Sequence, residues 1–326
     1  MKHISILVPQ GVILGSLEGP RLVLSEVNAL LVRMGKPPLF DVRLVGLAPE
    51  TPVNNGMYTI KADLLTNEVD KTDLIIIPAV EGDMIKNLED NHEFVPWIIK
   101  QYKAGAEVAS LCVGAFLLAS TGLINGKKCA THWMAANDFR RMFPDVDLVE
   151  DRIITDEHGI YSSGGAFSYL NLILYLIEKF AGREIAVFCS KAFQIDIKRD
   201  SQSPFIIFQG QKEHGDESIM KAQVFIEKNF QEKITVDQLA SMLALGRRNM
   251  ERRFKKATSN TVIEYIQRVK IEAAKKGFET GRKNISEIMY DVGYSDVKAF
   301  RTIFRKITGL SPIEYRNKYS KELYAA

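Results

Sequence analysis

A single cysteine, Cys112, lies where a short apolar run ends and a helical segment begins, in the stretch ASLCVGAFLLASTG. A thiol at such a turn can act as a nucleophile, because the N-terminus of a helix stabilises the thiolate. The thiol also needs a base that accepts its proton and a group that orients the base. His132, in the stretch CATHW, is the candidate base. The first question is therefore whether this chain does cysteine chemistry.

The other cysteines and histidines predict no chemistry of their own. Cys129 and Cys189 lie in strand-like and helical runs, so we expect buried, inert thiols. His92, His158 and His214 show no metal-ligand spacing with the cysteines, and we predict no metal and no other cofactor. Three cysteines in 326 residues do not form a disulfide framework, which predicts a reducing compartment, the cytoplasm.

Length and charge predict two domains with different partners. A chain of 326 residues can bury two cores, and no apolar run approaches the roughly 20 residues that span a bilayer, so we expect no membrane segment. Residues 218–326 contain 22 Lys and Arg against 12 Asp and Glu, a net charge of +10, whereas the whole chain has only +3. A basic half suits a polyanion such as double-stranded DNA, although a basic face can also serve solubility alone.

Residues 1–197 alternate short apolar runs with helical segments. We expect strands at 4–8, 42–47, 74–80 and 108–112, and helices at 21–34, 93–103, 113–120, 133–142 and 167–180. This order predicts a doubly wound, flavodoxin-like α/β domain with a mostly parallel sheet, whose sites lie at the carboxyl ends of strands. Residues 198–217 are polar and contain Pro and Gly, which predicts a linker, and residues 218–326 are predicted to be all-helical.

The helical half contains a repeat. The segments FKKATSNTVIEYI at 254–266 and FRKITGLSPIEYR at 304–316 are fifty positions apart. Both match the pattern F-(K/R)-K-x-T-x-x-x-x-I-E-Y. Each follows a helix, a tight turn and a second helix, which predicts two helix-turn-helix units at about 235–256 and 285–307.

The second helix of each unit has an apolar stripe and a polar face. Met250 and Phe254 form the stripe in the first unit, and Phe300 and Phe304 form it in the second. The residues left outward are Arg247, Arg248, Glu251 and Arg252 in the first unit, and Val297, Lys298, Arg301 and Thr302 in the second. Such faces suit the DNA major groove. A solvated helix in an ordinary bundle is the alternative, and the duplication of the face argues against it.

The stretch YSDVKAFRTIFRKITGLSPIEYR resembles the C-terminal signature of AraC/XylS-type transcriptional regulators, and the resemblance extends over about residues 219–319. It implies an all-helical DNA-binding domain. By resemblance, the residues that read bases are Arg248, Glu251 and Arg252, and then Lys298 and Thr302 near Val297 and Ala299. The first unit departs from the family pattern, because Gly246 replaces a Ser helix cap and Ser259 and Val262 replace Gly and Pro. We expect a somewhat less rigid first unit.

The stretch SLCVGAFLLASTGLINGKKCATHW resembles the class I glutamine amidotransferase-like superfamily, in its PfpI-type branch, over about residues 4–188. Relatives that are enzymes carry a carboxylate just after the histidine or an early glutamate. Met134 and Ser16 occupy those places here, and Glu18 would point to another face of its helix.

The third member of a catalytic set is therefore missing, and we expect no strong hydrolase activity. Cys112 is equally consistent with a small residue in a crowded turn and with part of a ligand pocket, and a thiolate would make it unusually reactive. We expect His132 to be a hydrogen-bonded residue at the start of a helix.

These features together predict a sequence-specific DNA-binding transcriptional regulator. Its N-terminal domain is expected to sense a small-molecule effector or to form a homodimer. A cysteine hydrolase tethered to DNA and a non-specific nucleoid-binding protein are the alternatives. The effector, the operator and the choice between activation and repression stay open.

Overall fold

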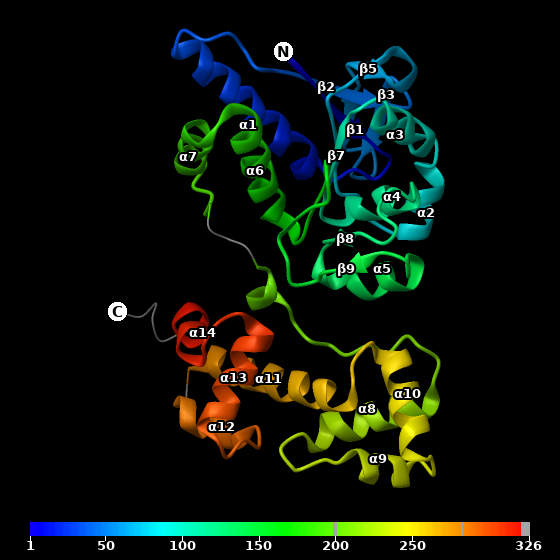
Figure 1. Ribbon diagram of the computed structural model, residues 1–326, viewed down its shortest axis with the longest axis vertical. Helices are drawn as coiled ribbons and strands as arrows, with labels where there is room; N and C mark the ends of the chain where they lie inside the picture. The colour runs from blue at the N-terminus through cyan, green and yellow to red at the C-terminus, as the bar shows by residue number, and fades with distance from the viewer. Residues whose placement is uncertain (198–200, 282, 321–326) are drawn as a thin grey trace. The chain divides into compact units, whose positions relative to one another are not determined.

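The computed structural model describes residues 1–197, 201–281 and 283–320, and the chain divides into two compact units, Met1–Gln202 and Ser203–Ala326 (Figure 1). The division lies inside the segment 198–217 that the sequence predicts to be a linker. Residues 198–200 of that segment lie outside the described residues, as do residue 282 and residues 321–326 of the predicted helical domain.

The first unit contains a seven-stranded sheet in the order β10-β11-β7-β6-β1-β2-β5. All neighbouring strands are parallel except β10 and β11, which are antiparallel. The strands of this sheet are β1 (Lys2–Val8), β2 (Phe40–Gly46), β5 (Leu64–Leu65), β6 (Leu74–Ile77), β7 (Glu107–Leu111), β10 (Ile154–Asp156) and β11 (Ile160–Ser163). Two small sheets pair β3 (Glu50–Val53) with β4 (Tyr58–Lys61) and β8 (Lys128–Cys129) with β9 (Asp147–Leu148).

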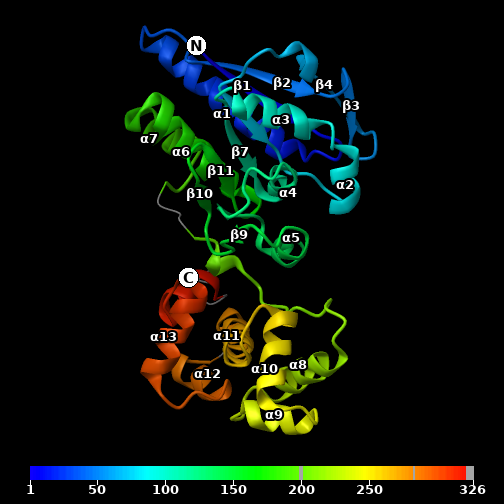
Figure 2. The ribbon, with the colours of Figure 1, turned by 45° about the vertical axis from the view of Figure 1, so that its right-hand side comes forward.

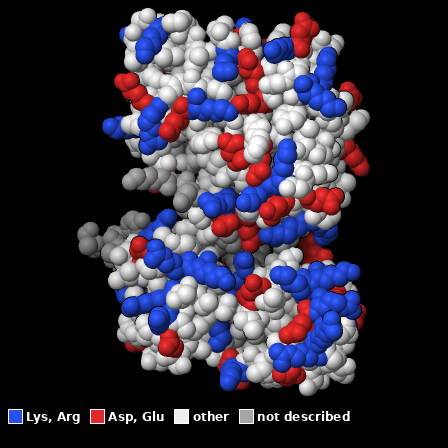
Figure 3. All heavy atoms as spheres, in the orientation of Figure 1, with Lys and Arg blue, Asp and Glu red and all other residues white. Residues whose placement is uncertain are grey.

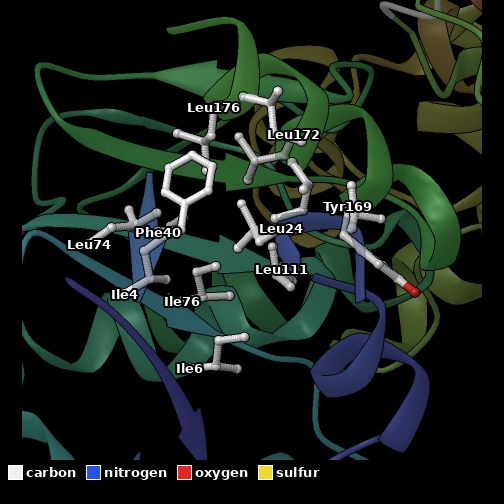
Figure 4. Close-up of a cluster of buried hydrophobic side chains, with 14 of the residues drawn as sticks. Ile4, Ile6, Leu24, Phe40, Leu74, Ile76, Leu111, Tyr169, Leu172 and Leu176 are labelled. Carbon is white, nitrogen blue, oxygen red and sulfur yellow. The ribbon is translucent and has the colours of Figure 1, made fainter. Parts of the chain in front are cut away.

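Helices cover both faces of the sheet (Figure 2). They are α1 (Leu14–Arg33), α2 (Met84–Asp90), α3 (Phe94–Lys103), α4 (Ala115–Ser120), α5 (Ala136–Met142), α6 (Tyr169–Ala181) and α7 (Arg183–Ala192). Alternate residues of β6 belong to two cores: Leu74 and Ile76 pack with α1, α6 and α7, whereas Ile75 and Ile77 pack with α3, α4 and α5. Figure 4 shows the first of these cores, with Leu24 of α1 and Leu172 of α6 directed at the sheet. A strand that is buried on both faces needs an uninterrupted apolar sequence, which β6 has as LIII.

The fold confirms the predicted doubly wound α/β domain and the four predicted strands, with differences at their ends. β6 ends at Ile77, three residues earlier than expected, because Pro78 follows and has no N–H for a ladder hydrogen bond. α1 begins at Leu14, seven residues before the predicted start, and continues through the buried Pro20.

The second unit is built from seven α-helices among the described residues, after the short 3-10 helix η5 (Ser203–Phe205). They are α8 (Glu217–Asn229), α9 (Val236–Met242), α10 (Arg247–Thr258), α11 (Val262–Thr280), α12 (Ile285–Asp291), α13 (Val297–Thr308) and α14 (Pro312–Tyr319). One core joins α8, α9 and α10 to the first half of α11, and a second core joins α12, α13 and α14 to its second half. The predicted helix-turn-helix units are thus α9–α10 and α12–α13, each on its own core.

The sequence repeat is also a repeat of hydrogen bonds. The hydroxyls of Thr258 and Thr308 each donate to the carbonyl four residues earlier, at 2.8 Å. The phenol groups of Tyr265 and Tyr315 are buried and each donates to a glutamate of an earlier helix at 2.7 Å, Glu227 and Glu279 respectively. The Thr and Tyr of the repeated motif therefore hold equivalent places in the two units.

Candidate nucleic-acid interface and cysteine elbow

The first candidate recognition helix is α10. Met250 and Phe254 are fully buried, as their spacing predicts. The helix begins after Gly246, which has extended backbone and no side chain that could cap the first turn. The turn before it contains Ala244 in a left-handed conformation, φ +50°. The predicted departure of the first unit from its family pattern is therefore visible as an uncapped helix start.

All four outward residues of α10 are exposed. Arg247 pairs with Asp237 of α9 at 3.0 Å and with Glu251 at 3.5 Å, and Arg252 donates to the Asn249 amide oxygen at 3.1 Å. The side chain of Arg248 forms no ion pair or hydrogen bond with any residue that the structure describes. Its guanidinium group is available to a phosphate or a base edge.

The second candidate recognition helix, α13, has a better-defined start. The Asp296 carboxylate accepts from the Ala299 N–H at 2.6 Å and caps the helix. Gly293 in the preceding turn has φ +73°, and a β-carbon there would lie 1.9 Å from the Gln231 carbonyl oxygen, so only glycine fits. Lys270 of α11 donates to the Gly293 carbonyl at 3.1 Å and stacks on the Tyr294 ring.

Phe300 and Phe304 are fully buried below α13, and the four outward residues predicted from the sequence are exposed: Val297, Lys298, Arg301 and Thr302. The side chains predicted to read bases therefore lie on the solvent face of each helix. Figure 3 shows Lys and Arg side chains gathering over α10. Whether each side chain reads a base stays a prediction.

Cys112 lies directly after β7, with the left-handed backbone conformation φ +55° that only a sharp turn imposes on a non-glycine residue. Its N–H donates to the Ser163 hydroxyl at 3.3 Å, and its carbonyl accepts from the Thr131 hydroxyl at 3.0 Å. Gly114 follows where a β-carbon would lie 2.6 Å from the carbonyl oxygens of Ile77 and Pro78. The turn has the geometry of a nucleophile elbow, and its tight packing explains why position 114 is a glycine.

Burial outweighs the effect of the helix N-terminus on the Cys112 thiol. Cys112 is buried, and the loss of hydration raises the pKa of its thiol to about 11. The hydrogen bond from the Val113 backbone lowers the pKa but is the smaller effect, and α4, the helix beyond the turn, has only six residues. Cys112 is therefore a protonated thiol at neutral pH. Cys129 and Cys189 are buried as predicted, and burial raises the pKa of both thiols.

Among the described residues, no hydrogen bond joins the Cys112 thiol to a base. His132 begins a short helix, where its Nδ1 accepts from the Met134 N–H at 3.1 Å, which confirms the expected hydrogen-bonded histidine. Burial lowers the pKa of its imidazole. Ser16 is buried and exchanges hydrogen bonds with Ile13 and Ala79, whereas Glu18 is exposed and paired with Arg21 at 2.6 Å. Glu18 is thus held in an ion pair on the surface of α1.

Two family matches divide the chain in the same way as the structure. Residues 26–179 match the DJ-1/PfpI family, and residues 239–318 match a family described as a helix-turn-helix domain. The second match contains α10 and α13 complete. The chain thus combines a DJ-1/PfpI domain with an AraC-type helix-turn-helix domain.

Curated relatives of this AraC-type chain are named as regulators. The HTH-type transcriptional regulator ArgR of Pseudomonas aeruginosa is 26% identical over 217 residues, which are 66% of this chain and 66% of ArgR. The HTH-type transcriptional regulator GbdR of the same species is 23% identical, over 69% of this chain and 61% of GbdR. The match therefore covers less than two thirds of the length of each of these relatives.

Solved structures show the same fold. A putative transcriptional regulator from Vibrio parahaemolyticus has a TM-score of 0.53 at 20% identity, over 59% of this AraC-type chain and 98% of its own. An AraC family transcriptional regulator from Pseudomonas putida has a TM-score of 0.51 at 15% identity, over 59% and 100% of the two chains. At these identities the likeness supports the fold alone.

Several residues that shape the sites of the AraC-type chain could not be found in its sequence. Ser163 and Thr131 position the elbow, but isolated hydroxyl residues carry no pattern.

Within residues 1–197, 201–281 and 283–320, no group of His, Cys, Asp or Glu is arranged to hold a metal ion. In the same residues, no helix combines the length and the apolar character that crossing a bilayer requires.

Proposed function

We propose that the chain is a sequence-specific, DNA-binding transcriptional regulator of the cytoplasm. The observation that carries the proposal is the presence of two exposed, basic helix faces at matching places of a duplicated helix-turn-helix unit. An ordinary helical bundle has no reason to duplicate such a face, whereas the DNA major groove repeats with every helical turn. The names of the curated relatives support the same activity.

In this proposal α10 and α13 enter successive major grooves on one side of the duplex, about 34 Å apart. The residues proposed to read bases are Arg248, Glu251 and Arg252 from α10 and Lys298 and Thr302 from α13, with Arg247, Val297 and Arg301 beside them. Arg side chains reach the O6 and N7 atoms of guanine, and Lys side chains reach the same atoms or phosphates.

The DJ-1/PfpI domain is proposed to sense a small-molecule effector and to join two copies of the chain into a homodimer. The hydroxyl of Ser168 supports an effector near the elbow. It is fully buried, has no hydrogen-bond partner among the described residues, and follows the loop that positions Cys112. Buried hydroxyl groups ordinarily have partners, so an effector that supplies one would bind favourably.

Hydrolysis is not part of the proposal. A cysteine hydrolase requires a thiolate and a base, whereas Cys112 is protonated and His132 accepts a backbone hydrogen bond through Nδ1. The elbow therefore retains the geometry of a nucleophile without the groups that activate one.

The test is selection of genomic DNA fragments by the purified full-length chain, followed by footprinting of the best-bound fragment. We expect two protected segments about one helical turn apart. The double variant Arg248→Ala/Lys298→Ala should lose the selection, whereas Arg43→Ala, which removes an exposed arginine of the first unit, should keep it. Equal affinity of the wild type for selected and unrelated fragments would show a non-specific binder instead.

A further inference from the structure

Gln202 lies in the predicted linker, but its side chain is buried in the first unit and fully hydrogen-bonded there. Its side chain is 1% exposed. Its oxygen accepts from the Gly165 N–H at 2.9 Å, and its amide nitrogen donates to the carbonyls of Thr131, Glu150 and Arg152 at 2.8–3.2 Å. One side chain therefore ties together three loops of the unit.

Two of these loops also position the cysteine elbow. Thr131 donates from its hydroxyl to the Cys112 carbonyl, while its own carbonyl accepts from Gln202. Ser163 accepts from the Cys112 N–H and precedes Gly164, where a β-carbon would lie 2.5 Å from the amide nitrogen of Gln202. Loops 130–132 and 163–165 therefore contact Cys112 on one side and Gln202 on the other.

The residues just after Gln202 are fixed to the second unit. We call residues 203–216 the strap. The Pro204 carbonyl accepts from the Tyr319 hydroxyl at 3.3 Å, and the Ile206 carbonyl accepts from the buried ammonium group of Lys275. The Phe208 N–H donates to Glu272 at 3.1 Å, and its ring packs edge-on against Tyr265.

The ends of the strap contact both recognition helices. At its start, the short helix η5 (Ser203–Phe205) packs against α13. At its end, Asp216 binds the guanidinium group of Arg253 in α10 through both carboxylate oxygens, at 2.6 and 2.8 Å. A shift of the strap would therefore act on α13 and α10 together.

From these contacts we infer that Gln202 is a positioning residue that couples the elbow loops to the recognition helices. A change in loops 130–132 and 163–165 displaces Gln202, and the displacement passes along the chain to the strap, because Pro204, two residues later, is already bound to the second unit. The inference rests on the proposed function, since it supplies the route by which an effector in the first unit alters DNA binding by the second.

Coupling between two sites is reciprocal, so it can be measured from the DNA side without knowing the effector. The experiment measures amide hydrogen exchange of the full-length chain with and without the best-bound genomic fragment. In the wild type, DNA should slow the amide exchange of α10 and α13. It should also change the amide exchange rates in loops 130–132 and 163–165 by about fivefold, which is the lower end of the range for allosteric coupling.

The variant Gln202→Met keeps the length of the side chain and removes its hydrogen bonds. We expect it to abolish the response of both loops while DNA still protects α10 and α13. The matched control is Gln209→Met, the same substitution at an exposed residue of the strap, and it should respond as the wild type does.

A second variant separates the contributions of the two loops. Gln202→Glu retains an oxygen for the Gly165 N–H but has no amide group to donate to Thr131. It should keep the response of loop 163–165 and lose that of loop 130–132.

A loop response that persists in both Gln202 variants would overturn the inference. So would a wild type in which DNA protects α10 and α13 but leaves both loops unchanged. If DNA protects neither recognition helix in the wild type, the proposed function fails and the inference fails with it.

Discussion

Ser259 and Gly309 end the two recognition helices at the same place in the repeat, and both have left-handed backbone, with φ of +56° and +73°. This conformation costs a residue with a β-carbon about 1–2 kcal/mol and costs glycine almost nothing. The first unit therefore carries local strain at the end of α10 that the second unit lacks.

Replacing Ser259 with glycine should stabilise the second unit. We expect Ser259→Gly to raise its free energy of unfolding by about 1 kcal/mol, because relief of the strain exceeds the entropy that glycine gives to the unfolded chain. Denaturant titration followed by the helical circular dichroism signal measures the change. Gly309→Ala should act in the opposite direction, and a loss of stability in Ser259→Gly would contradict this account of the turn.

The two kinds of basic residue on α10 should differ when they are removed. Arg252→Ala should weaken binding to the selected fragment by about 1–3 kcal/mol and relax the preference at one base pair, because a bidentate base contact is lost. Lys255→Ala, which removes an exposed lysine 3.9 Å from Glu264, should weaken selected and unrelated DNA alike. Competition binding with both fragments measures the difference. An equal loss on both fragments for Arg252→Ala would remove it from the base-reading residues.

The second unit should fold and bind DNA by itself, since its two cores contain no residue before Phe208. The strap should contribute to that stability. A fragment that begins at Ser203 should unfold at a higher denaturant concentration than one that begins at Glu217, because the shorter fragment loses the Phe208–Tyr265 contact and the Asp216–Arg253 ion pair. Both should bind the selected fragment more weakly than the full-length chain if that chain binds as a homodimer. Equal denaturation midpoints for the two fragments would show that the strap does not contribute to the stability of the second unit.

The thiol of Cys112 should react only at high pH. Its pKa of about 11 lies above the ordinary value near 8.5, so the folded state holds the proton longer than the unfolded state does. The contribution of this group to stability is complete below about pH 8.5 and is lost as the pH rises toward 11. Alkylation by iodoacetamide, located by peptide mass spectrometry, should be slow at pH 7 and rise up to about pH 11 in the native protein.

The denatured chain supplies the control for this labelling, and in it all three cysteines should react alike. If the alkylation rate of native Cys112 levels off below pH 8, the thiol is already a thiolate near neutral pH, and the assigned pKa is contradicted. Cys112→Ser should leave DNA affinity unchanged, because serine keeps the backbone hydrogen bonds of this residue with Ser163 and Thr131.

The parts of the fold that follow from a pattern could be predicted, and those that depend on a few polar contacts could not. The apolar runs of β1, β6 and β7 and the stripe of Phe300 and Phe304 repeat with the period of their elements, so their burial was expected. β11, with the sequence IYSS, was missed because its serines look exposed in the sequence and are buried in the sheet.

The same limit applies at the functional sites. The sequence left the reactivity of Cys112 open, because desolvation outweighs the effect of a short helix on its pKa and burial is a property of the folded chain. Gln202 falls in a segment whose composition is typical of a linker, and only the folded loops around it supply the partners that fix its side chain.

The length of α11 determines the angle between the two recognition helices around the axis of α11. Val262 and Tyr265 near its start belong to one core and Ile271 and Phe278 to the other, so both units are built on one uninterrupted helix. One residue inserted near Arg268 would turn the second unit by about 100° around this helix and direct α13 away from the side of the duplex that α10 contacts. Four inserted residues would bring the direction back to within about 40° and add about 6 Å to the separation. The spacing of half-sites that the protein accepts on DNA is thus determined by the number of residues in one helix that itself reads no base.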